Sequence, residues 1–156
     1  MYPIKKIYLA GPCDSEHRTM MVQVAKTIRE NGYEVYCPFE LKIENAWDMS
    51  QEAWSKKVFD KDIEAINNCD YIIMISLGRI STAGTNWEQG YAYALNKPIY
   101  VFQITNEPTS LMTYCGCTHF VNTNKYEVYE RISYILYAIK NSVMWSQYTI
   151  CTTTLT

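Results

Sequence analysis

The sequence lacks the residue patterns that hold structural metal ions or disulfide frameworks. Its six cysteines stand at positions 13, 37, 69, 115, 117 and 151, and no two of them form a Cys-x-x-Cys pair. The two histidines, His17 and His119, lie far apart. This spacing argues against a structural zinc site and against a disulfide-stapled domain. We therefore expect free thiols, no bound metal and no cofactor, as is usual in a reducing cytoplasm.

Long apolar runs and blocks of like charge are missing as well. No apolar stretch approaches the ~18 residues that a membrane span needs, and no secretory signal opens the chain. The net charge of −2 leaves no basic footprint for a nucleic acid polymer. These absences predict a cytoplasmic protein that binds neither membranes nor nucleic acid polymers.

The composition that is present is typical of one globular domain. The chain has 156 residues, of which 48% are hydrophobic and 19% are charged, so it can bury a sizeable core. Neither a repeat nor a linker divides it. We expect a single domain over residues 1–143 and a Thr-rich tail over residues 144–156, which is either disordered or packed on a partner chain.

Strand and helix patterns alternate along the chain. Strands are expected over residues 5–10, 33–37, 70–76 and 97–102, with a brief fifth near 119–121. Helices are expected over residues 16–31, 51–68 and 126–143, and a further one begins near residue 85. The segments 39–50 and 105–116 read as loops or short helices. The alternation predicts an α/β fold, doubly wound, with a mostly parallel five-stranded sheet, helices on both faces and a site at the strand carboxyl ends.

The first candidate for chemistry is Glu88, in the segment Gly84–Tyr91 that follows an apolar, β-branched strand. We expect Glu88 in the first turn of a helix, where the dipole favours an ionised carboxylate that can act as a nucleophile. Thr85-x-x-Glu88 is also a capping box, in which Glu88 merely closes the helix start. Against the cap, Glu88 shares a helical stripe with Tyr91 and Leu95. Both interpretations stay open at this point.

The second candidate is Asp62, on the helix expected over residues 51–68. The apolar stripe of this helix reads Trp54, Val58, Asp62, Ala65, Ile66 and Cys69. A carboxyl on an apolar face must find a partner or stay protonated, and desolvation raises its pKa. Such a group suits a proton donor, although a buried aspartate bonded to a neighbouring loop explains the pattern equally well.

The loop after the first strand, Gly11–Asp14, carries a weaker signal. It does not read Gly-x-Gly-x-x-Gly, so the sequence does not support a dinucleotide-binding fold. Gly11 nevertheless permits close approach of the backbone to a ligand at the strand end.

Three stretches taken together resemble the nucleoside 2-deoxyribosyltransferase superfamily. They are Ile7–Pro12, Asp62–Asp70 and Gly84–Pro98, and the resemblance spans about residues 5–137. It implies a flavodoxin-like fold and a covalent mechanism. Glu88 would attack C1′ of a deoxyribosyl group, Asp62 would protonate the leaving base, and Tyr8 would hold Glu88 by its hydroxyl. Two carboxyls in these roles follow the logic of retaining glycosidases.

The resemblance also implies a set of substrate-binding residues. These are Gly11, Thr82, Gly84, Ser110 and Met112. Hydroxyl residues at positions 82 and 110 resemble the branch of deoxynucleoside 5′-monophosphate N-hydrolases, where they bind the phosphate. Nucleoside transferases tend to carry Asp and Asn there. Asp14 argues against the hydrolase branch, because that branch places an arginine in the loop after the first strand.

The sequence interpretation therefore leans to a hydrolase that acts on a deoxynucleoside 5′-monophosphate. The alternatives are a transferase that moves the sugar to another base and a nucleotide-binding sensor without turnover. The partner is a small-molecule nucleoside or nucleotide. In the family the segment of Ser110 and Met112 is lent to the site by a neighbouring subunit, so the resemblance implies a homodimer or a higher homo-oligomer.

Overall fold

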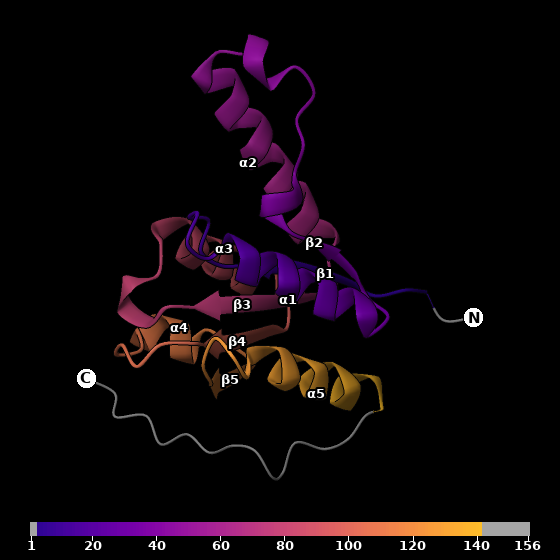
Figure 1. The fold of residues 1–156 in the computed structure, drawn as a ribbon, viewed down its shortest axis with the longest axis vertical. Coiled ribbons are helices and arrows are strands. Elements are labelled where there is room, and N and C mark those ends of the chain that lie inside the picture. The colour runs from indigo at the N-terminus through magenta and orange to yellow at the C-terminus, as the bar shows by residue number, and fades with distance from the viewer. Residues whose placement is uncertain (1–2, 142–156) are drawn as a thin grey trace.

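The sheet has five parallel strands in the order β2-β1-β3-β4-β5 (Figure 1). The computed structural model describes residues 3–141. The strands are β1 (Lys6–Ala10), β2 (Glu34–Tyr36), β3 (Tyr71–Ser76), β4 (Ile99–Gln103) and β5 (His119–Asn122). This order is the flavodoxin-like form of the doubly wound fold, which confirms the predicted fold class.

Helices cover both faces of the sheet. The helices are α1 (Arg18–Glu30), α2 (Gln51–Asn68), α3 (Ala83–Ala94), α4 (Leu111–Cys115) and α5 (Val128–Lys140). Helices α1 and α5 pack on one face, while α2 and α3 supply the apolar side chains of the other. The segment 39–50, expected as a loop or short helix, holds most of two single-turn helices, η1 (Pro38–Glu40) and η2 (Ala46–Asp48). A third, η3 (Gly78–Ile80), follows β3.

The alternation of side chains along β1 decides what reaches the second face. Ile7 and Leu9 belong to the core under α1 and α5, whereas Tyr8 and Ala10 belong to the core under α2 and α3. Successive strand residues point to opposite faces, so this split follows directly from the strand geometry. It directs the fully buried Tyr8 toward the two helices that carry the candidate carboxyls.

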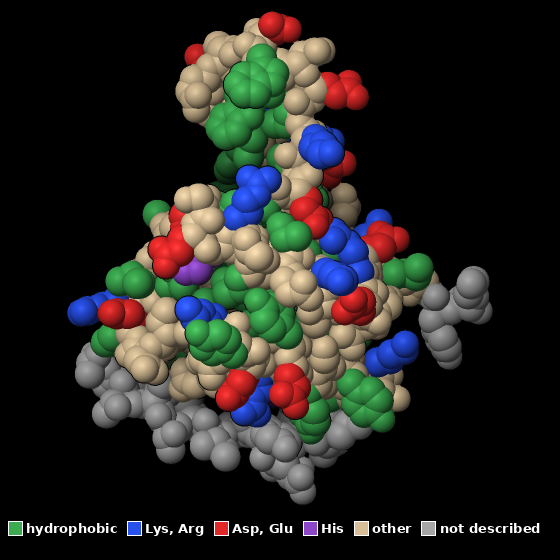
Figure 2. Space-filling model, in the orientation of Figure 1, with side chains coloured by type: hydrophobic (Ala, Val, Ile, Leu, Met, Phe, Trp, Pro, Cys, Tyr) green, Lys and Arg blue, Asp and Glu red, His purple; other side chains and the backbone are tan. Residues whose placement is uncertain are grey.

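Helix α2 departs from the prediction at its N-terminal half, which stands away from the sheet (Figure 1). Ile66 is its one fully buried residue, Asp62 is half-buried, and Trp54 is 40% exposed. The predicted apolar stripe was therefore wrong at Trp54. An 18-residue helix is ~27 Å long, and its first turns extend past the side chains of the sheet. Figure 2 shows hydrophobic side chains gathered on this projecting part.

The remaining expectations fall partly outside the described residues. The five cysteines within residues 3–141 are free. No helix in this range is long and apolar enough to cross a membrane. The last predicted turn, up to residue 143, and the tail 144–156 lie outside the described residues.

Candidate functional site

Helix α3 begins earlier than the sequence pattern indicated. Its N-cap is Thr82, whose Oγ1 accepts a hydrogen bond from the backbone N–H of Thr85 at 3.4 Å. The predicted capping box of Thr85 and Glu88 was therefore wrong, and Glu88 lies in the second turn. The dipole at the helix start acts mainly on the first turn, so it does not set the charge of Glu88.

Glu88 is held by Tyr8, as the resemblance implied. The Tyr8 hydroxyl donates to Oε1 of Glu88 at 3.0 Å. Burial of the carboxyl and, to a smaller extent, the charge of Asp62 raise the pKa of Glu88 to about 7, although the bond from Tyr8 lowers it. The expectation of a carboxylate that the helix keeps ionised is thus corrected: near neutral pH, Glu88 is poised between its two protonation states.

Asp62 has a tyrosine partner of its own. The Tyr36 hydroxyl donates to Oδ1 of Asp62 at 2.7 Å. Burial raises the pKa of Asp62, and the bond from Tyr36 opposes this shift. The direction agrees with the sequence prediction for an aspartate on an apolar face. No sequence motif indicates a role for Tyr36, because the signal lies in strand register, which hydrophobic periodicity does not give.

Tyr8 and Tyr36 form a stacked pair on adjacent strands. They stand opposite each other in the β1–β2 register, with ring centroids 5.4 Å apart and planes inclined by 16°. Burial and the nearby carboxyl charges raise the pKa of both phenols above the usual value, so both remain proton donors. Two neighbouring hydroxyls on the sheet therefore hold two carboxyls that come from different helices.

Both carboxyls open onto one groove between α2 and α3. The groove has a volume of about 420 Å³, a size found in small-molecule sites. It is lined by Trp54, Ser55, Val58, Phe59, Asp62, Ile63, Ile66, Gly84, Trp87 and Glu88. The mostly apolar lining explains the desolvation of the two acids. Gly84, predicted to bind substrate, belongs to this lining, and a Cβ at that position would meet no atom within 4 Å.

The Gly11 backbone is fixed by contacts within the protein. Its carbonyl accepts the hydroxyl of Thr85 at 3.0 Å, which ties α3 to the loop after β1. A Cβ on Gly11 would lie 2.5 Å from Cε of Met21, so the absence of a side chain accommodates α1. The predicted approach of Gly11 to a ligand stays a prediction.

Thr82 uses its hydroxyl in the helix cap. The Oγ1 atoms of Thr82 and Thr85 lie 2.9 Å apart. Since the Thr85 hydroxyl donates to Gly11, the Thr82 hydroxyl is the donor in this pair. Thr82 is exposed at the start of α3, and its hydroxyl would have to turn in order to donate to a ligand.

Ser110 and Met112 lie at a different cavity from Glu88. This second cavity has a volume of about 370 Å³ and is lined by Asn86, Gln89, Gly90, Tyr93, Ser110, Met112, Thr113, Cys115 and Gly116. It takes its α3 residues from another face of that helix. A single chain therefore does not bring Ser110 or Met112 into the groove of Glu88. Met112 is 77% exposed, so its side chain is accessible to a neighbouring molecule.

The loop after β1 carries one group of potential metal ligands. Ligand atoms of Asp14, Glu16 and His17 lie within 4.8 Å of one another, and none of the three lines the groove. The Asp14 carboxylate accepts the backbone N–H of His17 at 2.9 Å and lies 2.8 Å from its Nδ1. Hydrogen bonding to His17 lowers the pKa of Asp14. Arg18 lies over the Phe39 ring, with its Cζ 5.6 Å from the centroid.

Comparisons with known proteins agree with this geometry. The sequence profile of the nucleoside 2-deoxyribosyltransferase family matches residues 7–133. The chain is similar to the solved structure of a 2-deoxyribosyltransferase from the psychrotolerant bacterium Bacillus psychrosaccharolyticus, with 30% identity and a TM-score of 0.66. This match covers 80% of this chain and 90% of that one. No curated protein matches the sequence.

Two more distant structures show the same fold. A CMP N-glycosidase from Clostridium botulinum is 22% identical with a TM-score of 0.62, over 84% of this chain and 99% of that one. A conserved protein from Enterococcus faecalis is 19% identical with a TM-score of 0.63, over 85% and 99%. With the family profile covering most of its length, the chain belongs to the nucleoside 2-deoxyribosyltransferase family and is an enzyme of the glycosyl-transferring or N-glycosidase type.

Proposed function

We propose that the protein hydrolyses the N-glycosidic bond of 2′-deoxynucleoside 5′-monophosphates through a covalent deoxyribosyl-Glu88 intermediate. The observation that carries the proposal is the pair of carboxyls, Glu88 and Asp62, in one apolar groove, each held by a hydroxyl of the stacked tyrosines. Burial raises the pKa of both carboxyls, that of Glu88 to about 7, and a retaining mechanism requires the enzyme form in which Glu88 is ionised and Asp62 holds the proton.

In the first step an oxygen of ionised Glu88 attacks C1′ of the sugar. The C1′–N bond breaks, and its electron pair goes to the base nitrogen. The proton of Asp62 neutralises the leaving base, so Asp62 becomes a carboxylate. Tyr8 keeps its proton and orients Glu88 by donating to Oε1.

In the second step water replaces the base. Asp62, now a base, takes a proton from the water while the water oxygen attacks C1′. The ester bond to Glu88 breaks, which releases the deoxyribose 5-phosphate and returns both carboxyls to their first state. No redox partner or metal enters this balance.

The preference for a 5′-monophosphate depends on hydroxyl donors. Thr82 lies at the start of α3, where backbone N–H groups favour an anion, and its hydroxyl would have to turn from Thr85 to donate to a phosphate. The Asp14 carboxylate is bonded to His17. These hydrogen bonds lower the pKa of Asp14, so its charge stays in place and counts against the preference for a phosphate.

A transferase is the second candidate, and one observation favours it. The 30% identical structure is described as a 2-deoxyribosyltransferase. In that case a second base, instead of water, would accept the deoxyribosyl group from Glu88.

We further propose that the active form is a homodimer or a higher homo-oligomer. Ser110 and Met112 line their own cavity and reach the groove only if a second chain supplies them. The exposed aromatic side chains of Trp54, Phe59 and Trp87 along the groove support such an association.

Release of free base from a panel of deoxynucleosides and their monophosphates tests the proposal. Glu88→Ala should reduce the rate by a thousandfold or more, roughly 4 kcal/mol of barrier. Near-normal turnover by this variant would remove Glu88 as the nucleophile. Adding a second base separates the two enzymes, since only a transferase makes a new nucleoside. Thermal stabilisation by ligand without base release would instead indicate a sensor.

A further inference from the structure

Tyr36 takes no part in the steps described above, yet it makes the shorter of the two tyrosine–carboxyl bonds. Its hydroxyl lies 2.7 Å from Oδ1 of Asp62, compared with 3.0 Å between Tyr8 and Glu88. Within residues 3–141, no other group donates a hydrogen bond to the Asp62 carboxyl. The orientation of this carboxyl therefore depends on one phenol.

The helix that carries Asp62 has few other side-chain hydrogen bonds to the rest of the described chain. Tyr91 donates to Oδ1 of Asn67 at 3.0 Å, and Nζ of Lys97 donates to the carbonyls of Asn67 and Cys69 at 2.8 and 2.7 Å. These bonds all lie at the C-terminal end of α2. Of the hydrogen bonds in the described part of the chain, Tyr36 to Asp62 is the tie nearest to the projecting half of the helix.

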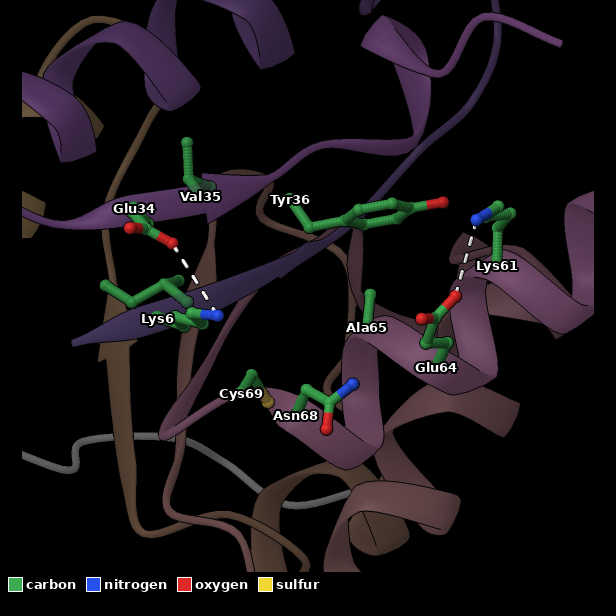
Figure 3. A pocket seen from close by; sticks show the side chains of 10 residues that line it. Lys6, Glu34, Val35, Tyr36, Lys61, Glu64, Ala65, Asn68 and Cys69 are labelled. Atoms are coloured by element: carbon green, nitrogen blue, oxygen red, sulfur yellow. Dashed lines mark hydrogen bonds and ion pairs between the residues drawn. The ribbon is translucent and has the colours of Figure 1, made fainter. Parts of the chain in front are cut away.

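A cavity separates the edge strand from the end of α2, which leaves the Tyr36 side chain to bridge them. The cavity has a volume of about 340 Å³. Figure 3 shows the Tyr36 ring extending from β2 across this space, beside Ala65, with its hydroxyl on the side of α2. Stacking on Tyr8 fixes the plane of the ring, so the hydroxyl has a defined place from which to donate.

This arrangement distinguishes the two oxygens of Asp62. The Tyr36 hydroxyl occupies a lone pair of Oδ1, so the proton of the neutral acid belongs on Oδ2. We propose that Tyr36 is a positioning residue: it holds Oδ1 of Asp62 so that Oδ2 delivers the proton to the leaving base. This inference rests on the proposed function, in which Asp62 is the acid.

The test compares Tyr36→Phe with Tyr91→Phe. Each variant keeps its aromatic ring and loses one hydroxyl that is bonded to a side chain of α2. Tyr36→Phe loses the bond to Asp62, and Tyr91→Phe loses the bond to Asn67. We expect Tyr36→Phe to lower kcat for base release about tenfold to a hundredfold, a part of what a general acid contributes, with KM within about twofold. Tyr91→Phe should keep wild-type kcat. Equal losses in the two variants would show a general tether and overturn the proposal.

The dependence of the cleavage rate on the leaving base distinguishes a positioning role of Tyr36 from a merely structural one. A substrate with 7-methylguanine as its base carries a cationic leaving group that needs no proton. Its cleavage by Tyr36→Phe should stay within about twofold of the wild type, while cleavage of natural bases falls. The loss should also vanish in an Asp62→Asn background, since Tyr36 acts through Asp62. A uniform loss across bases, or an additive loss in the double variant, would contradict the proposal.

A titration separates failure of this inference from failure of the proposed function. The bond from Tyr36 lowers the pKa of Asp62, so Tyr36→Phe should raise it. Carboxyl carbon NMR measures this without turnover. If the wild type released no base, the proposed function would fail, and the titration would still decide whether Tyr36 holds Asp62. An unchanged Asp62 titration would overturn the positioning role.

Discussion

At the scale of the residue, burial of Glu88 opposes folding. Its pKa rises from 4.5 to about 7, so between these pH values the folded chain keeps a proton that the unfolded chain has lost. The free energy of unfolding therefore falls as pH rises through this window and levels off above pH 7. Below pH 4.5 both states hold the proton and the penalty is absent.

We predict that Glu88→Gln gains stability relative to the wild type as pH rises. The difference in unfolding free energy should grow by on the order of 3 kcal/mol between pH 4 and pH 8, because the amide has no proton to lose. Urea denaturation at both pH values measures it. A difference that is independent of pH would mean that Glu88 titrates in the folded protein as it does in solvent.

Tyr8 affects the pH below which the activity is expected to fall. The Tyr8 hydroxyl lowers the pKa of Glu88, and the proposed mechanism requires Glu88 to be ionised. Tyr8→Phe should therefore shift the acid limb of the kcat/KM profile to higher pH. Tyr33→Phe is the matched control, because its hydroxyl donates to the Leu136 carbonyl on the opposite face of the sheet. A limb that stays in place in Tyr8→Phe would contradict the assignment.

At the scale of the element, α2 depends on Ile66 for its seat on the sheet. Ile66 is fully buried, and it lies one turn from Asp62. Ile66→Ala should cost about 2–5 kcal/mol of stability and also lower kcat, since the helix that carries the acid loses its anchor. Ile132→Ala, at an equally buried site on α5, should lose similar stability and keep kcat. Denaturation and base release on folded protein distinguish the two, and equal kcat values would count against α2 as the sensitive element.

How far the sequence predicts these elements depends on what each pattern encodes. Apolar, β-branched runs predicted the five strands, and the order of the elements predicted the sheet. The pattern also selected Glu88 and Asp62, which line one groove, and the family resemblance added Tyr8, which is bonded to Glu88. Hydrophobic periodicity marks an apolar face but not what covers it, so the projection of α2 was missed. Strand register is equally invisible to it, which is why Tyr36 was not found.

At the scale of the whole molecule, the proposed homo-oligomer would complete each groove with Ser110 and Met112 of a neighbouring chain. We predict that Glu88→Ala and a Ser110→Ala, Met112→Ala double variant are each impaired, but regain activity when the two chains are co-expressed. In a mixed dimer one groove receives Glu88 from one chain and an intact Ser110–Met112 segment from the other. With random pairing about a quarter of all sites are intact.

Base release by the co-expressed chains, together with solution scattering, measures this. If each chain supplied its own Ser110 and Met112, no mixed dimer would contain an intact site and activity would not return. A monomer with full activity would also rule out the shared site.

The uneven anchoring of the two helices that carry Glu88 and Asp62 has an evolutionary consequence. Glu88 stands on α3, which is tied to the β1 loop through Thr85, while the outer wall of the groove is α2, a helix with a single fully buried side chain. Mutations in the projecting N-terminal half of α2 disturb little of the core. Sequence drift there therefore changes the shape of the groove at little cost in stability. Such changes would alter which bases fit the groove and would leave Glu88 and its contacts on α3 unchanged.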